Sequence, residues 1–353
     1  MSDMIKVAVD AMGGDNAPGE VVKGAVEALQ ANKRIFVYLT GRKEDIEEEL
    51  AKYEYPKDRL EIVPTTEVIE MAEQPTTAIR TKKDSSMVRG LRMVKSGEAD
   101  AFVSAGSTGA VLVGGILLVG KAKGVQRSPL APLIPTRTGV SLLIDCGANV
   151  DARSDHLVQF AQMGSIYMEQ VMGIENPRVA IVNIGAEEEK GNSLVKETMP
   201  KLKETKGIHF IGSIEARDIP EGYADVIVCD AFVGNVILKL YEGVGSTMIG
   251  MIKQGLMTSL RSKIGALLIK PSLKGVVKMF DTSHYGGAPL LGLRGLVVKT
   301  HGSSKAAEIK NSILQCITFT EQRINEQIVE RLAQLSDEDT VSEDAATDAG
   351  EEQ

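Results

Sequence analysis

The sequence predicts an α/β protein with a doubly wound, three-layer α/β/α architecture. Short apolar runs rich in Val, Ile and Ala recur along the chain, and amphipathic stretches with helical spacing lie between them. Continuous apolar strands that alternate with helices are typical of a parallel sheet covered on both faces. Several of these runs also end in a polar, glycine-containing turn, as strands of open α/β sheets do beside a ligand site.

The elements follow in order along the chain. The apolar runs predict strands at Ile5–Asp10, Phe36–Thr40, Leu60–Val63, Ala101–Ser104, Ser141–Asp145, Arg178–Asn183, His209–Gly212 and Val226–Cys229. The amphipathic stretches predict helices at Gly19–Ala31, Glu44–Lys52, Met87–Ser96, His156–Met172, Ser193–Thr205 and Val236–Tyr241. Because no repeat or linker interrupts this pattern, we expect one catalytic domain over 1–335, with an amphipathic helical excursion at about 246–280.

Composition excludes several classes of function. Of the 353 residues, 43% are hydrophobic but only 4% are aromatic, with no Trp, which argues against a module that stacks nucleic-acid bases or sugars. Residues 336–353 hold eight of the 48 acidic residues and no base, so we expect a disordered acidic tail. The rest of the chain is neutral, which argues against a nucleic-acid partner.

The chain is expected to be cytoplasmic. It begins without a signal peptide, and its most apolar stretch, 109–120, is shorter than the roughly 20 residues a spanning helix needs. The three cysteines are far apart, with no CxxC pair, and no ligand spacing indicates a metal.

Five strand ends carry polar turns with small residues, which predicts one site assembled from several loops. The turns begin at Asp10, Ser104, Asp145, Asn183 and Asp230. In open α/β sheets, ligands bind beyond the carboxyl ends of the strands. The alternative is that glycine simply closes tight turns between strand and helix.

The turn at 104–109 has the composition of an anion-binding loop. Ser104, Gly106, Ser107 and Thr108 offer backbone N–H groups and hydroxyls at a predicted helix start. The lysine of a Walker loop is missing, and the chain holds no GxGxxG dinucleotide motif. The hydroxyls could alternatively serve as ordinary N-caps.

Two further turns supply candidate catalytic residues. Lys190 and Asn192 follow one strand, beside three glutamates that could equally form a solvated helix start. Asp230 and Asn235 follow another strand and precede a helix. His284 and His301 lie beside Gly and Ser turns and are further candidates, whereas His156 and His209 are expected to be structural. Cys146 could be a nucleophile, but a lone cysteine is more often a small buried hydrophobe.

Seven segments of the chain, four of them at the turns described above, together resemble one known family. They are DAMGGD (10–15), SAGSTGA (104–110), DCGANVD (145–151), EARD (215–218), DAFVGNVILK (230–239), YGGAPLLGL (285–293) and HGSS (301–304). The chain resembles the bacterial acyl-carrier-protein:phosphate acyltransferases of phospholipid synthesis, the PlsX family, over about residues 4–330. The resemblance implies a fold similar to phosphate acetyltransferases and to isocitrate/isopropylmalate dehydrogenases, and a homodimer.

The same resemblance implies transfer of a fatty acyl group from acyl carrier protein to inorganic phosphate, giving acyl phosphate for phosphatidic acid synthesis. Phosphate is itself an oxygen nucleophile and a thiolate leaves readily, so the residues need only bind phosphate, orient it and stabilise the oxyanion. We therefore expect no cofactor, with Lys190, Asp230 and Asn235 as catalytic residues and Ser104, Gly106, Ser107, Thr108 and Asn192 as phosphate ligands.

The resemblance also implies an acidic carrier-protein partner, for which the segment 80–96 offers a basic patch. Its bases for docking are Arg80, Lys82, Lys83, Arg89 and Arg92. The alternative is a solvated helix face capped by Asp84.

A membrane surface is a further expected partner. No acidic residue lies between Glu242 and Asp281, whereas this segment holds six bases. On one helical wheel, five apolar residues form a stripe: Leu256, Leu260, Ile264, Leu267 and Leu268. The bases Arg261 and Lys263 flank this stripe, and Pro271 is expected to end the helix. This pattern is typical of a helix lying in an anionic membrane surface. The resemblance implies that this surface is the inner face of the cell membrane, where a membrane-bound glycerol-3-phosphate acyltransferase would use the acyl phosphate. The alternative is a helix packed in the core or in a dimer.

Two other classes of function remain to be distinguished. An oxidoreductase on the related dehydrogenase fold would need a dinucleotide site and a metal-binding carboxylate cluster, neither of which the sequence contains. A non-catalytic scaffold at the membrane would leave the five polar turns unexplained.

Overall fold

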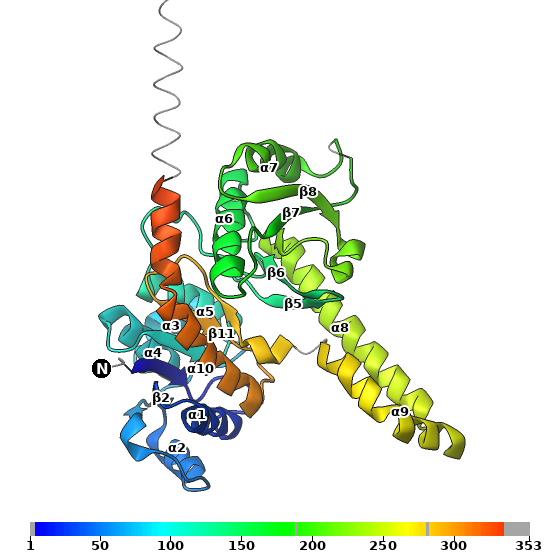
Figure 1. The fold of residues 1–353 in the computed structure, drawn as a ribbon. Helices are drawn as coiled ribbons and strands as arrows, with labels where there is room; N and C mark the ends of the chain where they lie inside the picture. Colours follow the sequence, from blue (N-terminus) through cyan, green and yellow to red (C-terminus); the bar gives the residue numbers. More distant parts are fainter. Residues whose placement is uncertain (1–3, 188, 280–281, 335–353) are drawn as a thin grey trace, which may run out of the picture.

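The computed structural model describes residues 4–187, 189–279 and 282–334, and in these it contains two β-sheets. The first has the strand order β10-β11-β4-β1-β2-β3 and the second the order β5-β6-β9-β7-β8. Figure 1 shows the two sheets with their helices as two lobes, from which a helical hairpin projects. The doubly wound α/β class is confirmed, although the expected single sheet is replaced by two.

The first sheet combines the N-terminal strands with a strand pair from residues 288–299. Its strands are β1 (Ile5–Asp10), β2 (Ile35–Gly41), β3 (Leu60–Pro64), β4 (Ala101–Ser104), β10 (Ala288–Pro289) and β11 (Leu296–Lys299). Its helices are α1 (Gly19–Ala31), α2 (Lys43–Leu50), α3 (Pro75–Thr81), α4 (Ser86–Ser96), α5 (Thr108–Gly114) and α10 (Ala306–Glu321). All pairs are parallel except β10–β11, so the carboxyl ends of β11, β4 and β1 lie side by side.

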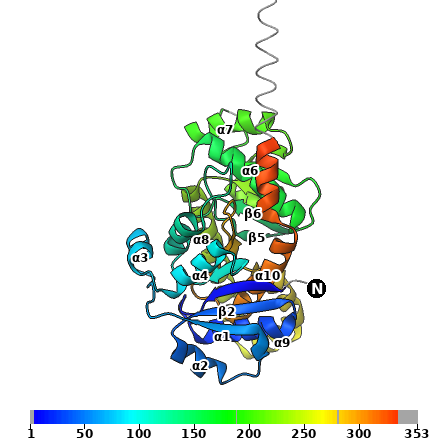
Figure 2. The same ribbon diagram turned by 90° about the vertical axis from the view of Figure 1, so that its left-hand side faces the viewer.

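The second sheet is formed by the middle of the chain. Its strands are β5 (Leu133–Thr136), β6 (Gly139–Ile144), β7 (Arg178–Asn183), β8 (His209–Glu215) and β9 (Val226–Val228), with helices α6 (Ser154–Gln170) and α7 (Ser193–Glu204). Only the β5–β6 pair is antiparallel. The largest buried apolar cluster contains Val7 and Val298 of the first sheet together with Leu142 and Val226 of the second, so the two lobes share one core. Figure 2 shows the lobes stacked, with the chain between residues 324 and 334 lying beside α6.

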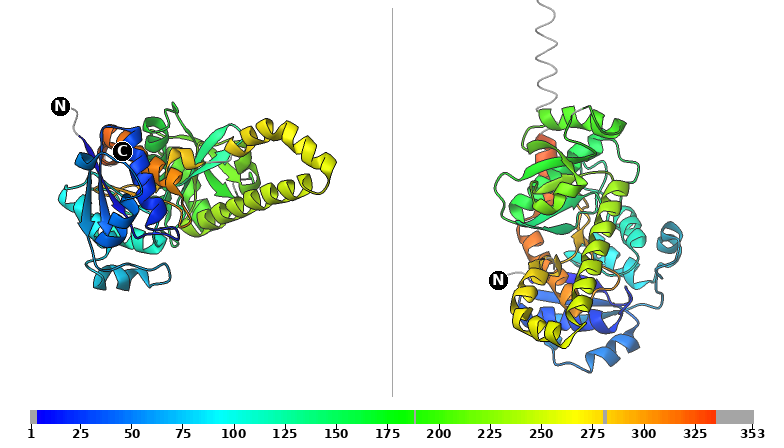
Figure 3. Two further views of the ribbon diagram at one scale, coloured as in Figure 1. Left: turned by 90° about the horizontal axis from the view of Figure 1, so that it is seen from below. Right: turned by 90° about the vertical axis from the view of Figure 1, so that its right-hand side faces the viewer.

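Helices α8 (Ala231–Leu256) and α9 (Leu260–Met279) form the projecting hairpin. Only Ala231 and Gly234 of α8 are buried. Beyond them the two helices run side by side away from the body (Figure 3). The expected excursion at 246–280 is therefore the outer part of a longer hairpin, while the acidic tail at 336–353 lies outside the described residues.

Two expectations about this segment are wrong. Leu256 and Leu260 belong to different helices, because the chain turns between them, so the apolar stripe is not one continuous helical face. Pro271 lies inside α9 rather than at its end. The missing N–H removes one hydrogen bond, and the helix continues to Met279.

The first turn of α8 is tightly packed on the end of β6, and this contact gives a stability prediction. A Cβ atom on Gly234 would lie 1.9 Å from the carbonyl oxygen of Asp145. Gly234→Ala should therefore lower the free energy of unfolding by about 1–3 kcal/mol, the usual cost of overpacking. Chemical denaturation measures this change.

The same helix offers a matched control. A Cβ on Gly243 would have no atom within 4 Å, so Gly243→Ala should leave stability unchanged or raise it by up to about 1 kcal/mol. Equal stability of the two variants would contradict the packing described at Gly234.

Candidate active site

Three loops meet at the carboxyl ends of β1, β4 and β11. The N–H of Asp15 donates to the carbonyl of Gly302 (2.8 Å), and the N–H of Thr300 donates to that of Ser104 (3.0 Å). A Cβ on Gly13 would lie 2.8 Å from the nitrogen of Gly106, so glycine is required for this close approach. The loops 10–15, 104–109 and 299–304 therefore form one interlocked surface.

A buried carboxylate holds the centre of this surface. The hydroxyl of Ser104 donates to Oδ2 of Asp10 at 2.7 Å, and the N–H of Gly106 donates to the same hydroxyl at 3.0 Å. Asp10 is 2% exposed, and its burial raises the pKa of its carboxyl above the ordinary value. Ser104 and Gly106, both expected phosphate ligands, thus shape the loop from beneath.

A cavity of about 930 Å³ opens above these loops, between them and α8. Thr108, Lys299 and His301 line it from the first lobe, and Asn235 and Lys239 line it from α8. A largely apolar wall completes it, to which these residues contribute: Leu133, Ile134, Pro135, Ile237, Leu238, Tyr241, Val244, Met248 and Ile249. The cavity can therefore hold an anion beside a long apolar chain.

The predicted site residues are only partly brought together. Thr108 and Asn235 line the cavity. Ser107 is buried directly before α5, and its side chain makes no capping hydrogen bond, so the N-cap alternative is not seen there.

Asp230 is the N-cap of α8, where its Oδ1 accepts the N–H groups of Phe232 (2.9 Å) and Val233 (3.0 Å). Both bonds use Oδ1, which leaves Oδ2 for another donor. Asp230 itself does not line the cavity, but it begins the helix that carries Asn235 into it.

Lys190 and Asn192 lie on the loop after β7, in the second lobe, and neither lines the cavity. The ammonium of Lys190 donates to Glu187 at 2.8 Å, and both side chains are about half exposed (48% and 54%). This contact lowers the pKa of the Glu187 carboxyl. Asn192 caps α7, accepting the N–H of Val195 at 2.9 Å. The charge of Lys190 is thus partly neutralised by Glu187, and its side chain lies outside the cavity.

The three cysteines are buried. Cys146 lines the cavity but is 2% exposed, and burial raises the pKa of its thiol well above the ordinary value. Burial also raises the pKa values of Cys229 and Cys316. These environments disfavour a cysteine nucleophile.

Of the two candidate histidines, His301 lines the cavity and His284 does not. Nδ1 of His301 accepts the N–H of Ser303 (3.3 Å), and its Nε2 lies 4.0 Å from a Glu242 carboxylate oxygen. His156 accepts the N–H of Arg153 at the start of α6, and His209 contacts the carbonyl of Asn176. Over the described residues, no group of three His, Cys, Asp or Glu is arranged to hold a metal ion.

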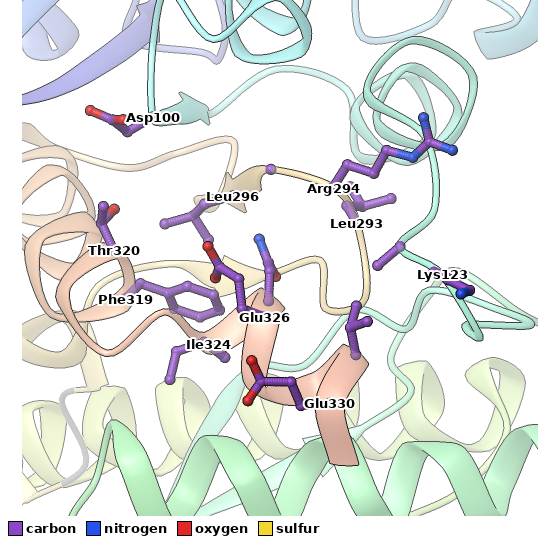
Figure 4. A pocket seen from close by; sticks show the side chains of 14 residues that line it. Asp100, Lys123, Leu293, Arg294, Leu296, Phe319, Thr320, Ile324, Glu326 and Glu330 are labelled. Atoms are coloured by element: carbon purple, nitrogen blue, oxygen red, sulfur yellow. The ribbon is translucent and has the colours of Figure 1, made fainter. Parts of the chain in front are cut away.

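A second cavity, of about 460 Å³, lies at the opposite edge of the first sheet. Figure 4 shows it between Asp100, before β4, and the segment 319–330, with Leu296 at the start of β11. Its charges are mixed, with Lys123 and Arg294 near Glu326 and Glu330. It lies at the amino ends of β4 and β11, away from the loops 10–15, 104–109 and 299–304, and none of the predicted site residues lines it.

Comparison with known proteins decides the family. The model of a family described as "Fatty acid synthesis protein" matches residues 5–327. The chain belongs to this family. It is 50% identical over 335 residues to a phosphate acyltransferase of Alkaliphilus oremlandii, covering 95% of this chain and 99% of the relative. It is 48% identical over 341 residues to one of Clostridioides difficile, covering 96% of this chain and 100% of that relative.

Solved structures with a similar fold confirm the expected relation to phosphate acetyltransferases. A phosphotransacetylase of Staphylococcus aureus superposes with a TM-score of 0.57 at 18% identity, covering 90% of this chain and 94% of that one. One of Streptococcus pyogenes superposes equally well. At this identity the likeness concerns the fold alone.

The basic segment of this family member is mostly exposed, and the loop before it reaches the cavity. Arg80, Lys83, Arg89 and Arg92 are exposed on α3 and α4 and in the turn between them. Met71, on the preceding loop, lines the cavity. Lys82 is instead held by an ion pair with Glu73 and donates to the carbonyl of Val68 (2.6 Å). The expected cap of α4 by Asp84 is wrong, because Ser85 caps this helix. The carboxylate of Asp84 instead accepts the N–H and the hydroxyl of Thr66.

The apolar residues of α9 are exposed to solvent. Leu260, Ile264, Leu267 and Leu268 are 56–75% exposed and span about 100° of the helical wheel. Arg261 and Lys263 lie on either side of them on this wheel and are also exposed. Leu256, on α8, is only partly exposed and lies outside this stripe. Among the described residues, no helix is both long and apolar enough to span a bilayer.

The sequence interpretation missed the contribution of β11 to the site. Lys299 ends this strand and lines the cavity, as does Lys239 on α8. The signal was present, because the apolar run 296–298 is followed by KTHGSS, the same succession of strand and small polar turn that marked the other loops.

The geometry gives a direct test of the predicted catalytic residues. Asp230→Asn keeps a good N-cap while it removes the charge, and Lys190→Ala removes the ammonium from an exposed loop. If both groups act on phosphate, each substitution should lower turnover by a factor of about 100 or more with the fold intact. Steady-state rates and thermal denaturation measure this.

Lys196→Ala, at an exposed position of α7, is the matched control and should leave the rate unchanged. Near-normal rates for both Asp230→Asn and Lys190→Ala would remove these residues from the mechanism.

Proposed function

We propose that this chain transfers a fatty acyl group from acyl carrier protein to inorganic phosphate, forming acyl phosphate for phospholipid synthesis. The observation that carries the proposal is the cavity at the carboxyl ends of both sheets, in which cationic side chains and an apolar wall occur together. Membership of a family whose similar members are named phosphate acyltransferases supports it.

The reaction needs no covalent protein intermediate. A phosphate oxygen attacks the thioester carbonyl, a C–O bond forms, and the C–S bond breaks as the carrier's thiolate leaves. A thiol has a pKa of about 8.5, so the leaving group needs little help from an acid. The protein's tasks are to bind phosphate, orient it and stabilise the oxyanion.

We assign these tasks to the loops described above. Thr108 and the backbone N–H groups at 107–108 orient phosphate from the first lobe, and Asn235 donates from α8. The free oxygen of Asp230 accepts a phosphate proton and so raises the fraction of dianion. Lys190 and Asn192, which do not line the cavity, would have to approach it from the second lobe to contact phosphate.

The activity is tested with purified protein and an acyl carrier protein loaded with a long saturated chain. Thiol release should require phosphate, and hydroxylamine should trap an acyl hydroxamate from the acyl phosphate product. Sulfate in place of phosphate is the control. Thiol release that proceeds equally without phosphate would contradict the proposal.

The carrier protein is proposed to dock on the exposed bases of α3 and α4, whose neighbouring loop reaches the cavity through Met71. Lys82 holds Glu73 and is a poor test residue. The double substitution Lys83→Glu and Arg89→Glu should raise the KM for the acyl carrier, and the effect should shrink as salt screens the charges. Initial rates at low and high ionic strength measure both changes.

Lys33→Glu is the matched control, because Lys33 is exposed at the amino end of β2, the opposite edge of the sheet. An unchanged KM at low salt in the double variant would exclude this docking surface.

The stripe of α9, defined by Leu260, Ile264, Leu267 and Leu268, is proposed to lie on the inner face of the cell membrane. Its exposure and its flanking bases suit an anionic bilayer, and a poorly soluble acyl phosphate would be delivered there to a membrane-bound glycerol-3-phosphate acyltransferase. We also propose that the protein is a homodimer, for which the exposed apolar residues of α8 offer a surface.

The double substitution Leu260→Glu and Ile264→Glu should abolish sedimentation with anionic liposomes, because charges oppose burial of the stripe. Turnover in solution and the dimer mass from light scattering should not change. Gln254→Glu, at an exposed position of α8 outside the stripe, is the control and should still bind. A double variant that falls to monomers would assign the stripe to the dimer instead.

A further inference from the structure

Lys299 is a buried lysine at the centre of the three interlocked loops. It is the last residue of β11 and pairs with Ser104 of β4 in the parallel register. Its side chain is 7% exposed and lines the cavity. Its ammonium donates to the carbonyls of Ala105 (3.4 Å) and Thr300.

Among the described residues, no carboxylate lies within ion-pair distance of the Lys299 ammonium, although Asp10 and Asp15 act on it from farther away. Asp10 is already bound by the hydroxyl of Ser104. Burying a cation against neutral carbonyls alone is costly, and an ammonium has three donors, of which two are used here.

We propose that Lys299 is the principal phosphate-binding cation of the site, with its third donor directed to a phosphate oxygen in the cavity. This assignment rests on the proposed function. The Ala105 contact ties the ammonium to the loop 104–109, so cation and loop N–H groups would hold one anion from a single rigid surface. Lys190, in contrast, is exposed and already paired with Glu187.

Other charged groups face the same cavity and set the conditions for binding. Lys239 adds positive charge, whereas Asp15, Glu242 and Glu308 add negative charge, and the imidazole of His301 also lines the cavity. Lys239 also donates to Glu242 at 2.8 Å, which partly neutralises it. Lys299 is therefore the cation in this group that lacks a carboxylate partner among the described residues.

The burial of Lys299 also predicts a pH dependence. Desolvation, with a smaller contribution from Lys239, lowers the pKa of Lys299 to about 8, while Asp10 and Asp15 oppose the shift. The ammonium is charged below this pH and loses its proton above it. Phosphate binding by the free enzyme should therefore weaken above pH 8.

The test compares Lys299→Met, which keeps the length of the side chain without charge, and Lys299→Arg, which keeps the charge at any accessible pH. Lys299→Met should raise the KM for phosphate about tenfold to a hundredfold, as expected for a lost charged hydrogen bond, and change the KM for the acyl carrier less than about twofold. It should also abolish the rise in thermal midpoint that inorganic phosphate causes without the carrier. Lys33→Met, at an exposed position, is the matched control and should behave as wild type.

Lys299→Arg gives a second measurement, the pH dependence of kcat/KM for phosphate, which would not change if Lys299 were only structural. At saturating acyl carrier, wild-type kcat/KM for phosphate should fall above about pH 8, and this fall should disappear in Lys299→Arg. The assignment is overturned if Lys299→Met keeps the wild-type phosphate KM, or if the alkaline fall persists at the same pH in Lys299→Arg. If Lys299→Met fails to fold, the arginine variant decides alone.

The same assays separate this inference from the proposed function. Wild-type protein that shows no phosphate-dependent thiol release contradicts the function, whatever the variants do. If the wild type is active but the KM for phosphate does not change in the Lys299 variants, only the assignment of the cation is contradicted.

Discussion

The hydrogen bond from Ser104 to the buried carboxylate of Asp10 is the contact on which the site depends. It joins the ends of two neighbouring strands, and the hydroxyl in turn holds the N–H of Gly106. Because the sheet order places β11 on the other side of β4, the same point also brings Lys299 against this loop. The order of three strands thus determines which polar groups can reach one anion.

Helix α8 connects this site with the outer surface of the molecule. It begins at the cap formed by Asp230, carries Asn235 and Lys239 past the cavity, and continues into the exposed hairpin with α9. Its apolar residues therefore form part of the cavity wall near the site and part of the exposed surface farther out. In the proposed function, this continuity gives the acyl chain an apolar path from the reacting carbonyl towards the membrane.

Much of the fold could be predicted because buried parallel strands are continuous apolar runs, as at Ile5–Asp10, which the structure reproduces residue for residue. The strands β5, β10 and β11 were missed. Proline interrupts β5 and β10, whereas the apolar run of β11 is as short as that of the predicted strand β9 and was overlooked. The split into two sheets depends on contacts between distant segments, which periodicity does not contain. The turn between α8 and α9 was missed since both sides of it have helical apolar spacing. Thr108 and Asn235 were predicted from strand-end chemistry, whereas Lys299 ends a strand that the sequence analysis did not predict.

The central claim is that phosphate binds in the cavity beside Lys299, and the position of a bound phosphate analogue tests it most directly. Crystals of the protein soaked with arsenate, which substitutes for phosphate, would reveal the arsenic position through its anomalous scattering. We predict a peak inside the 930 Å³ cavity, within hydrogen-bond distance of the Lys299 ammonium and beside Thr108. An arsenic peak on the loop 189–192 with none in the cavity would contradict it.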